Sequence, residues 1–308
     1  MNINKQKYID SNYNPDENTL EEIENLNKHK EDLSNFSLIG AQLENVYLVN
    51  ANMRKCNLTK ANLKNASMFG VDLRDAELFK TDFENANLKN AKLEGANLLG
   101  ANLTNTKLEN INWGRDYKVI NELEAEEASK KGDNELANRK YKEAEEVYRT
   151  LKISMQSQTL GDDTGKFFIR EMCARRKQLK KYSPSRIGSK IIEITTGYGE
   201  KLSNIGFTII GIIALCMVLY GIEGISYSDP ANGSRIIGFF GDDIQKYGVL
   251  NTLGNLFYFS VVVYSTVGFG EMLPIGPIGK TVMIFEGIAG GLVLAILIIA
   301  LYKKTMDR

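Results

Sequence analysis

The sequence has few of the residues from which enzymes and metal proteins build their centres. Its 308 residues include one histidine and three cysteines. His29 stands alone, so catalysis or metal binding through histidine would depend on a single side chain. Cys56, Cys173 and Cys216 have no metal-binding spacing, and we expect no disulfide between them. No nucleophile elbow, phosphate loop or paired-cysteine motif occurs, so we expect neither an enzyme nor a cofactor.

Net charge is also absent, because 38 basic residues balance 38 acidic ones. The net charge of the chain therefore indicates no particular class of binding partner. The sequence has no basic stripe with interleaved aromatic residues, so we expect no binding to nucleic acid. The N-terminus is polar, and we expect no cleavable signal peptide there. Hydrophobic residues are concentrated instead in the last third of the chain.

Two apolar runs in that last third are long enough to cross a membrane. They span residues 204–225 and 279–303, and Glu286 is the only charge between residues 281 and 302. Each run meets the requirement of roughly 20 predominantly apolar residues for a spanning helix. Buried helices of a large soluble core are the alternative. Basic residues precede the first run and follow the second, so we expect a multi-pass plasma-membrane protein with both termini in the cytoplasm.

A shorter apolar run, residues 250–265, lies between the two spans. It is too short to cross the bilayer and return, which favours a half-helix that dips into the membrane. Irregular backbone is tolerated at that depth only where it is buried in protein or lines an aqueous path. The negative end of such a half-helix would favour a cation beyond it.

The five residues after the half-helix have the composition of an ion filter. Glycine enters positive φ without a Cβ penalty, so a glycine-bearing run can point successive carbonyls the same way. Carbonyls aligned in this way replace the water around a permeating cation. The sequence therefore predicts ion binding by the backbone of Thr266, Val267, Gly268, Phe269 and Gly270.

The run YFSVVVYSTVGFGEMLP, followed by an apolar helix with a mid-span glycine, resembles the pore module of the two-transmembrane potassium channels. The resemblance covers residues 204–308. It implies a homotetramer in contact with the lipid bilayer that passes K⁺ in preference to Na⁺ and holds no metal beyond the permeant ion. It also implies that residues 266–269 supply the carbonyl cages and that Gly270 forms the outer mouth.

Two positions depart from that family's usual pattern. Phe269 stands where the family most often has tyrosine, whose hydroxyl braces the filter from behind. Glu271 stands where the family most often has aspartate, and Tyr258 lies where the family places an aromatic partner for that carboxylate. The resemblance therefore implies a supporting role for Tyr258 and Glu271, and it leaves the ratio of K⁺ to Na⁺ permeability open.

The second span carries three further candidates. Gly290 and Gly291 form a pair at its middle, and the resemblance aligns Gly290 with a gating hinge. Close packing of helices is the other reason for a glycine there. Glu286 is a charge site inside the membrane, which is a functional hypothesis by default. It could attract cations, or it could be neutral and bonded to the half-helix.

The first part of the chain repeats every five residues, as in ANLKN, ASMFG and VDLRD. A large residue recurs at sixteen positions from Leu38 to Trp113, with a small residue two positions earlier in most repeats. A period of five fits neither a helix nor a strand. It suits a solenoid with a corner in every repeat, and it resembles the pentapeptide-repeat family. That resemblance implies a right-handed quadrilateral β-helix with four repeats per coil.

Charge argues against one known role of such repeats, the mimicry of DNA. Residues 31–113 hold ten acidic and nine basic residues, so they present no strong negative field. A repeat pattern identifies the fold of a protein but says little about its function. We expect a scaffold or regulatory role.

These patterns divide the chain into four parts. We expect a disordered N-terminus and a capping helix in residues 1–30, with residues 1–15 disordered. The β-helix follows in residues 31–115, and an α-helical adaptor with an interfacial segment in residues 116–203. The pore domain then occupies residues 204–308. An unidentified cytoplasmic protein or ligand could bind the adaptor or the β-helix.

The sequence thus predicts a potassium-selective channel with a large cytoplasmic domain. A non-selective cation channel is one alternative. A membrane-tethered scaffold protein with a vestigial pore is the other.

Overall fold

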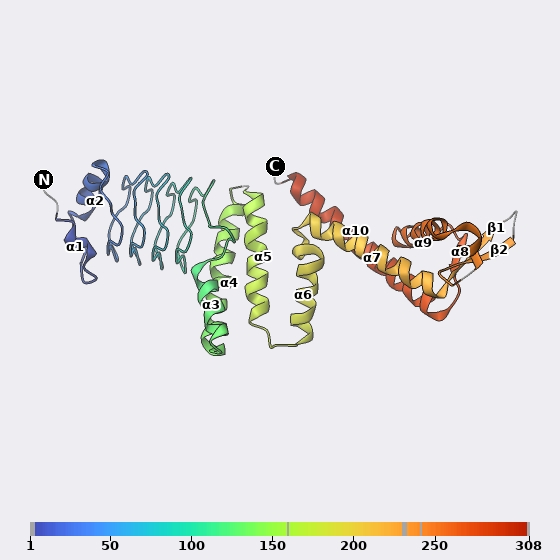
Figure 1. Ribbon diagram of the computed structural model, residues 1–308. Helices are drawn as coiled ribbons and strands as arrows, with labels where there is room; N and C mark the ends of the chain where they lie inside the picture. Colours follow the sequence, from blue (N-terminus) through green and yellow to red (C-terminus); the bar gives the residue numbers. More distant parts are fainter. Residues whose placement is uncertain (1–3, 159, 230–232, 241, 307–308) are drawn as a thin grey trace. The chain divides into compact units, whose positions relative to one another are not determined.

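The computed structural model describes residues 4–158, 160–229, 233–240 and 242–306, which form two compact units. The first unit extends to residue 190, and the second covers residues 191–306 (Figure 1). The repeats lie in the first unit. Both long apolar helices lie in the second.

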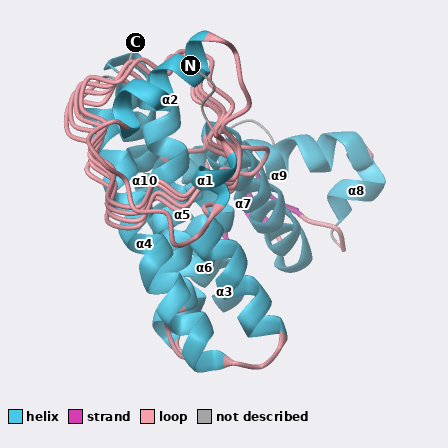
Figure 2. Ribbon diagram, turned by 90° about the vertical axis from the view of Figure 1, so that its left-hand side faces the viewer, coloured by secondary structure: helices cyan, strands magenta, loops and turns pink. Residues whose placement is uncertain are grey.

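The repeats form a stack of coils in which each coil takes 20 residues. Parallel bridges join Ser37 to Asn57 at one end of the ladder and Lys92 to Asn112 at the other. Backbone bonds between coils are short, with Leu38 N donating to the Asn57 carbonyl at 2.7 Å. Figure 2 shows the successive coils nearly superimposed. Four repeats therefore make one coil, as predicted, whereas the right-handed winding stays a prediction.

The inside of the stack is filled by the two residue types that the repeat alternates. Large central residues such as Leu58 and Phe83 have no exposed surface, and small residues such as Ala61 lie beside them fully buried. Cys56 occupies one of the small positions, and burial raises the pKa of its thiol to about 12. A thiol in that state is chemically inert, which agrees with a packing role.

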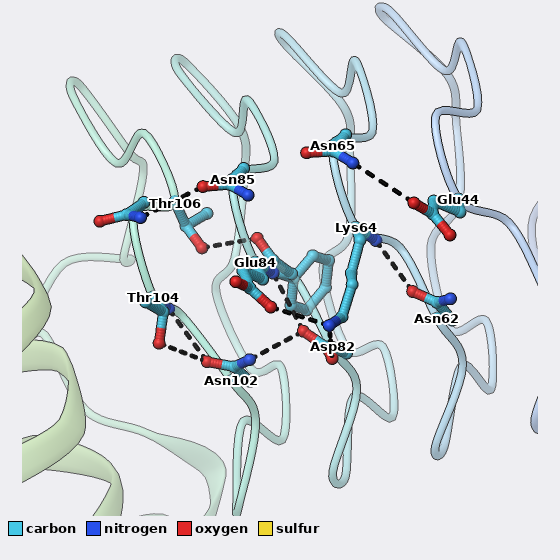
Figure 3. Close-up of polar contacts among 12 residues, drawn as sticks. Glu44, Asn62, Lys64, Asn65, Asp82, Glu84, Asn85, Asn102, Thr104 and Thr106 are labelled. Carbon is cyan, nitrogen blue, oxygen red and sulfur yellow. Dashed lines mark hydrogen bonds and ion pairs between the residues drawn. The ribbon is translucent and has the colours of Figure 1, made fainter.

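Each corner is made by the fifth residue of a repeat, which has a left-handed backbone. Asn45, Lys60 and Asp75 have φ of 63°, 58° and 59°, and Gly70 and Gly100 take the same place in their repeats. Asparagine and glycine tolerate this region best. Side chains also form ladders along the faces, such as the bond from Asn102 to Asp82 at 2.9 Å (Figure 3).

The N-terminal edge of the stack is covered by α1 (Gln6–Ile9) and α2 (Thr19–Lys28). Tyr8 is fully buried and stacks on Phe36 with ring centroids 4.9 Å apart. Its carbonyl accepts a bond from Ser37 N at 2.6 Å, and the Glu24 carboxylate accepts one from Tyr47 N at 2.7 Å. These contacts satisfy the backbone N–H groups of Ser37 and Tyr47, which would otherwise be unpaired at the edge of the stack.

The predicted disorder of residues 1–15 is therefore wrong for residues 4–15. Polar composition suggested disorder, but burial of Tyr8 against the first coil orders this segment. Residues 1–3 lie outside the described residues. The predicted capping helix is present as α2, where Ile23 and Leu26 are buried.

Three helices cover the other edge, namely α3 (Ile120–Lys130), α4 (Asn134–Gln156) and α5 (Gly161–Lys177). The Gln158 amide replaces a missing strand, because it donates to the Thr106 carbonyl at 2.6 Å and accepts from Leu108 N at 2.9 Å. Trp113 of the last repeat packs edge-on against Phe167, with centroids 5.1 Å apart. The β-helix and the adaptor, which we predicted as separate parts, share one hydrophobic core.

Two long helices dominate the second unit, α7 (Leu202–Glu223) and α10 (Pro277–Met306). By length and composition, both could cross a membrane. The shorter helices α8 (Asp242–Tyr247) and α9 (Val249–Tyr264) come between them in the sequence. Gly224 and Gly248, with φ of 90° and 82°, stop α7 and start α9. The observed bounds differ by one to three residues from the predicted 204–225, 250–265 and 279–303.

Helix α6 (Pro184–Thr196) and a short 3₁₀ turn (Gly197–Gly199) precede α7. The isoleucines of α6 are at least half exposed, namely Ile187, Ile191, Ile192 and Ile194. An exposed apolar stripe on a helix that leads into a spanning segment is typical of an interfacial helix.

A three-stranded antiparallel sheet, which the sequence analysis missed, joins α7 to the region after α9. It consists of β1 (Ile225–Asp229), β2 (Gly233–Ile237) and β3 (Met272–Pro274), in the order β2-β1-β3. Residues Tyr227 and Met272 are paired across β1 and β3. Ile225 and Ile237 are fully buried and pack with side chains of α7 and α9.

Candidate ion-conduction site

Residues 266–270, here called the filter segment, leave the C-terminal end of α9 and lead into β3. Thr266, Gly268 and Gly270 have φ of 59°, 54° and 76°, so alternate residues take the left-handed region. At the inner end, Thr266 N donates to the Val263 carbonyl at 3.0 Å and Val267 N to the Val262 carbonyl at 3.3 Å. Residues that the sequence singled out are thus contiguous with the half-helix that it predicted.

The filter segment is open on one side in a single chain. Val267 and Phe269 are 56% and 62% exposed. A Cβ added at Gly268 or Gly270 would meet no other atom within 4 Å. One copy therefore leaves much of the filter segment uncovered by the described residues of its own chain.

Tyr258 and Glu271 both line a small cavity of about 110 Å³ behind the filter segment, together with Phe269 and Met283. Among the described residues of one chain, no hydrogen bond joins Tyr258 to Glu271. Their supporting roles stay predictions.

Glu286 lies fully buried where three helices meet. Tyr220 of α7 donates to Glu286 Oε2 at 2.8 Å, and Ser260 of α9 donates to Glu286 Oε1. The Ser260 hydroxyl also lies 3.1 Å from the Ile213 carbonyl. Of the two roles considered for Glu286, bonding to the half-helix is the one whose contact is present.

The two glycines of α10 have different surroundings. Gly290 is buried, and a Cβ there would overlap the carbonyl of Tyr264 at the end of α9. Gly291 is exposed, and a Cβ there would meet nothing within 4 Å. Close packing thus accounts for the glycine at position 290, whereas the hinge role of both residues stays a prediction.

Three polar residues of this region escaped the sequence analysis. Tyr220 and Ser260 could have been found, because a lone carboxylate in an apolar span needs hydroxyl partners on the facing helices. Glu223, at the end of α7, accepts a bond from Gly279 N in the first turn of α10. Its position before Gly224 gave no signal, because the partner is 56 residues away.

Two family models match the chain. Eight copies of the model "Pentapeptide repeats" match residues 37–75 and 76–112, and the model "Ion channel" matches residues 234–306. The chain carries pentapeptide repeats and an ion channel domain. Neither match is to an enzyme family. The channel match and the two long apolar helices together indicate a membrane protein.

Solved structures similar to the chain include two cyanobacterial pentapeptide repeat proteins. Rfr23 from Cyanothece 51142 is 38% identical, with 27% of this chain and 56% of that protein covered and a TM-score of 0.27. The protein alr5209 from Nostoc PCC 7120 is 34% identical, with 29% and 73% covered and a TM-score of 0.26. The chain thus spans little more than half of the length of Rfr23. No curated protein matches the chain.

Proposed function

We propose that the chain forms a potassium-selective channel in which four copies surround one line of ions. The observation that carries the proposal is the filter segment, placed between the C-terminal end of α9 and β3 and flanked by two helices of spanning length. Its alternating left-handed residues allow successive carbonyls to face one axis. The negative end of α9 favours a cation beside that axis.

The openness of the filter segment supports a homotetramer. A dehydrated K⁺ ion needs carbonyl oxygens on all sides, and one chain offers them on one side only. Four copies about an axis would complete each cage and would also cover the exposed Val267 and Phe269. The carbonyls of residues 266–269 would then form the ion sites, and Gly270 the mouth.

Membrane orientation follows from the charge pattern. Basic residues before α7 and after α10 favour a cytoplasmic location for both termini in the plasma membrane. The apolar stripe of α6 would lie on the inner leaflet, and the basic residues that precede it would favour anionic lipid head groups.

The direct test measures ion flux through purified protein in liposomes. With K⁺ inside and Na⁺ outside, a selective channel gives a reversal potential near that of K⁺, and Ba²⁺ blocks the flux. Gly268→Ala should abolish conduction, because an L-residue is strained at φ 54°. Gly254→Ala in α9, where an added Cβ meets nothing within 4 Å, is the matched control.

The alternatives predict other outcomes of the same experiment. A non-selective cation channel gives a reversal potential near zero. A scaffold with a vestigial pore gives no flux, and Gly268→Ala then changes nothing. A mass that differs from four chains in detergent would contradict the fourfold arrangement.

The β-helix can be tested by shortening it. Removing residues 61–80 deletes one whole coil and keeps the ladder in register, because bridged residues are 20 apart. If the β-helix is a scaffold, conduction should not change. If it is regulatory, open probability should change while the reversal potential stays the same. Removing residues 61–75 instead puts the later repeats out of register and should prevent folding.

A further inference from the structure

The outer end of the filter segment is joined to the three-stranded sheet by its backbone. Ser228 N of β1 donates to the Glu271 carbonyl, directly after the filter segment, at 3.1 Å. The next residues continue the ladder, since Tyr227 pairs with Met272 and Ser226 with Leu273. Among the described residues, those at 268–270 make no hydrogen bond of their own. The segment is therefore held by α9 at its inner end and by β1 at its outer end.

The sheet itself is fixed to the helices that flank the pore. Ile225 and Ile237 are fully buried in a cluster with Tyr220 and Phe259. Phe239 N, just beyond β2, donates to the Gly221 carbonyl of α7 at 2.7 Å. Arg235 of β2 lies over the rings of Tyr227 and Tyr247, 5.1 and 4.7 Å from their centroids. Strand β1 follows α7 directly, and its sheet is packed against both α7 and α9.

The side chains at the outer end of the filter segment cannot supply such a link. Val267 and Phe269 carry no polar group, and Phe269 is 62% exposed in one chain. Position 269 therefore has no aromatic hydroxyl that could brace the filter segment from the side. Among the described residues, the hydrogen-bonded attachment at this end is the β1–β3 ladder.

We propose that β1 is a positioning element for ion selectivity, and that Ser228 acts through its backbone N–H to hold the outer end of the filter segment. The inference depends on the proposed function, because it assigns a role in ion conduction. Loss of this attachment lets the Glu271 carbonyl and Gly270 move, which loosens the outermost ion cage. Conduction then decays faster and discrimination against Na⁺ falls.

The sheet offers a closely matched pair of proline substitutions. Ser228→Pro removes the N–H that bonds to Glu271. Ser234 of β2 faces Ser228 across the sheet. Because Ser228 directs its N–H toward β3, this facing pair is a non-hydrogen-bonded one, and the Ser234 N–H points to the free edge. Proline is tolerated on such an edge, so Ser234→Pro is the control. Ser228→Ala keeps the N–H and controls for the lost hydroxyl.

In bilayer recordings, we expect Ser228→Pro to differ from the wild type and the two control variants to resemble it. Ser228→Pro should speed the decay of current during sustained opening about tenfold, the equivalent of one hydrogen bond of about 1.4 kcal/mol. Its permeability ratio for Na⁺ over K⁺ should rise, while Ser234→Pro and Ser228→Ala behave as the wild type. Wild-type behaviour of Ser228→Pro, or equal damage by both prolines, would overturn the proposal.

A second measurement needs no variant, in case Ser228→Pro does not assemble. In the wild-type protein in K⁺, hydrogen exchange at the Ser228 amide should be at least about tenfold slower than at Ser234, and it should accelerate when Na⁺ replaces K⁺. Equal exchange at both amides, or exchange at Ser228 that does not depend on the ion, would contradict the inference. A wild-type protein that passes no ions would instead contradict the proposed function, while slow Ser228 exchange would still report the β1–β3 bond.

Discussion

The two units of the molecule differ in how much of their hydrogen bonding and apolar burial one chain provides. The β-helix and its covering helices bond largely within one chain, because the coils bond to each other and Glu24 and Gln158 bond to backbone groups at the two edges. In the second unit, only 22% and 17% of the most apolar windows of α7 and α10 are buried. The filter segment is open as well. The first unit thus buries its apolar groups within one chain, whereas the second leaves exposed the surface that the proposed lipid contacts and fourfold assembly would cover.

The largest effect should come from the closest helix contact in the second unit. Gly290→Ala places a methyl group on the Tyr264 carbonyl, so α10 and α9 can no longer pack. We expect loss of assembled, conducting protein by size exclusion and liposome flux. Gly291→Ala should assemble and conduct, and it should gain about 1 kcal/mol of helix propensity. If Gly290→Ala conducts normally, close packing is not the reason for that glycine.

The first unit should respond to a cavity in its own core. Phe83→Ala removes a fully buried ring and should lower the free energy of unfolding of this unit by about 4 kcal/mol. Phe69 is 38% exposed on the same β-helix, so Phe69→Ala should cost about 0.5 kcal/mol. Denaturant unfolding followed by circular dichroism measures both. Similar losses would mean that the interior of the coils does not dominate stability.

A smaller effect should follow from the buried carboxylate of the second unit. Glu286→Ala leaves the Tyr220 hydroxyl without its acceptor, whereas Ser260 can still bond to the Ile213 carbonyl. We expect a loss of about 2 kcal/mol, mainly the cost of the Tyr220 hydroxyl left without an acceptor, seen as a lower melting temperature in detergent. Tyr220→Phe should remove most of that cost in the double variant. Additive losses from the two substitutions would show that the contact contributes nothing.

The smallest change should be a gain in the first unit. Lys60 has a left-handed backbone at a corner where most other repeats have asparagine or glycine. Lys60→Asn should raise the free energy of unfolding by about 1 kcal/mol, because asparagine tolerates that region better. Lys107→Asn, at a position without positive φ, is the control and should have no such benefit. Equal effects would mean that corner strain does not limit stability.

The sequence predicted most of the first unit because its interactions repeat. A period of five predicted the coil, and the alternation of large and small residues predicted its buried interior. What it missed are contacts between distant, unrepeated residues. Tyr8 lies against Phe36, and Gln158 bonds to Thr106, and no local pattern marks either pair.

The same limit applies to the candidate site. The filter segment, the half-helix before it and both spans were predictable from composition and glycine placement. The β1–β3 ladder was not, because three-residue and five-residue strands carry almost no periodic signal. The partners of Glu286 could have been predicted, since the sequence shows one charge in an apolar span and few hydroxyl groups that could bond to it.

The covered edges of the β-helix have a consequence for how chains can meet. Tyr8 and Glu24 bond to backbone groups of the first coil and Gln158 to those of the last, so these groups are not available for a second chain to extend the ladder. Subunits gathered around a common pore would have to touch through the flanks of their coils, where side chains rather than backbone amides decide the fit. In the proposed channel, the β-helices of neighbouring subunits could then separate or rejoin without breaking a backbone ladder, while the pore domains stay assembled.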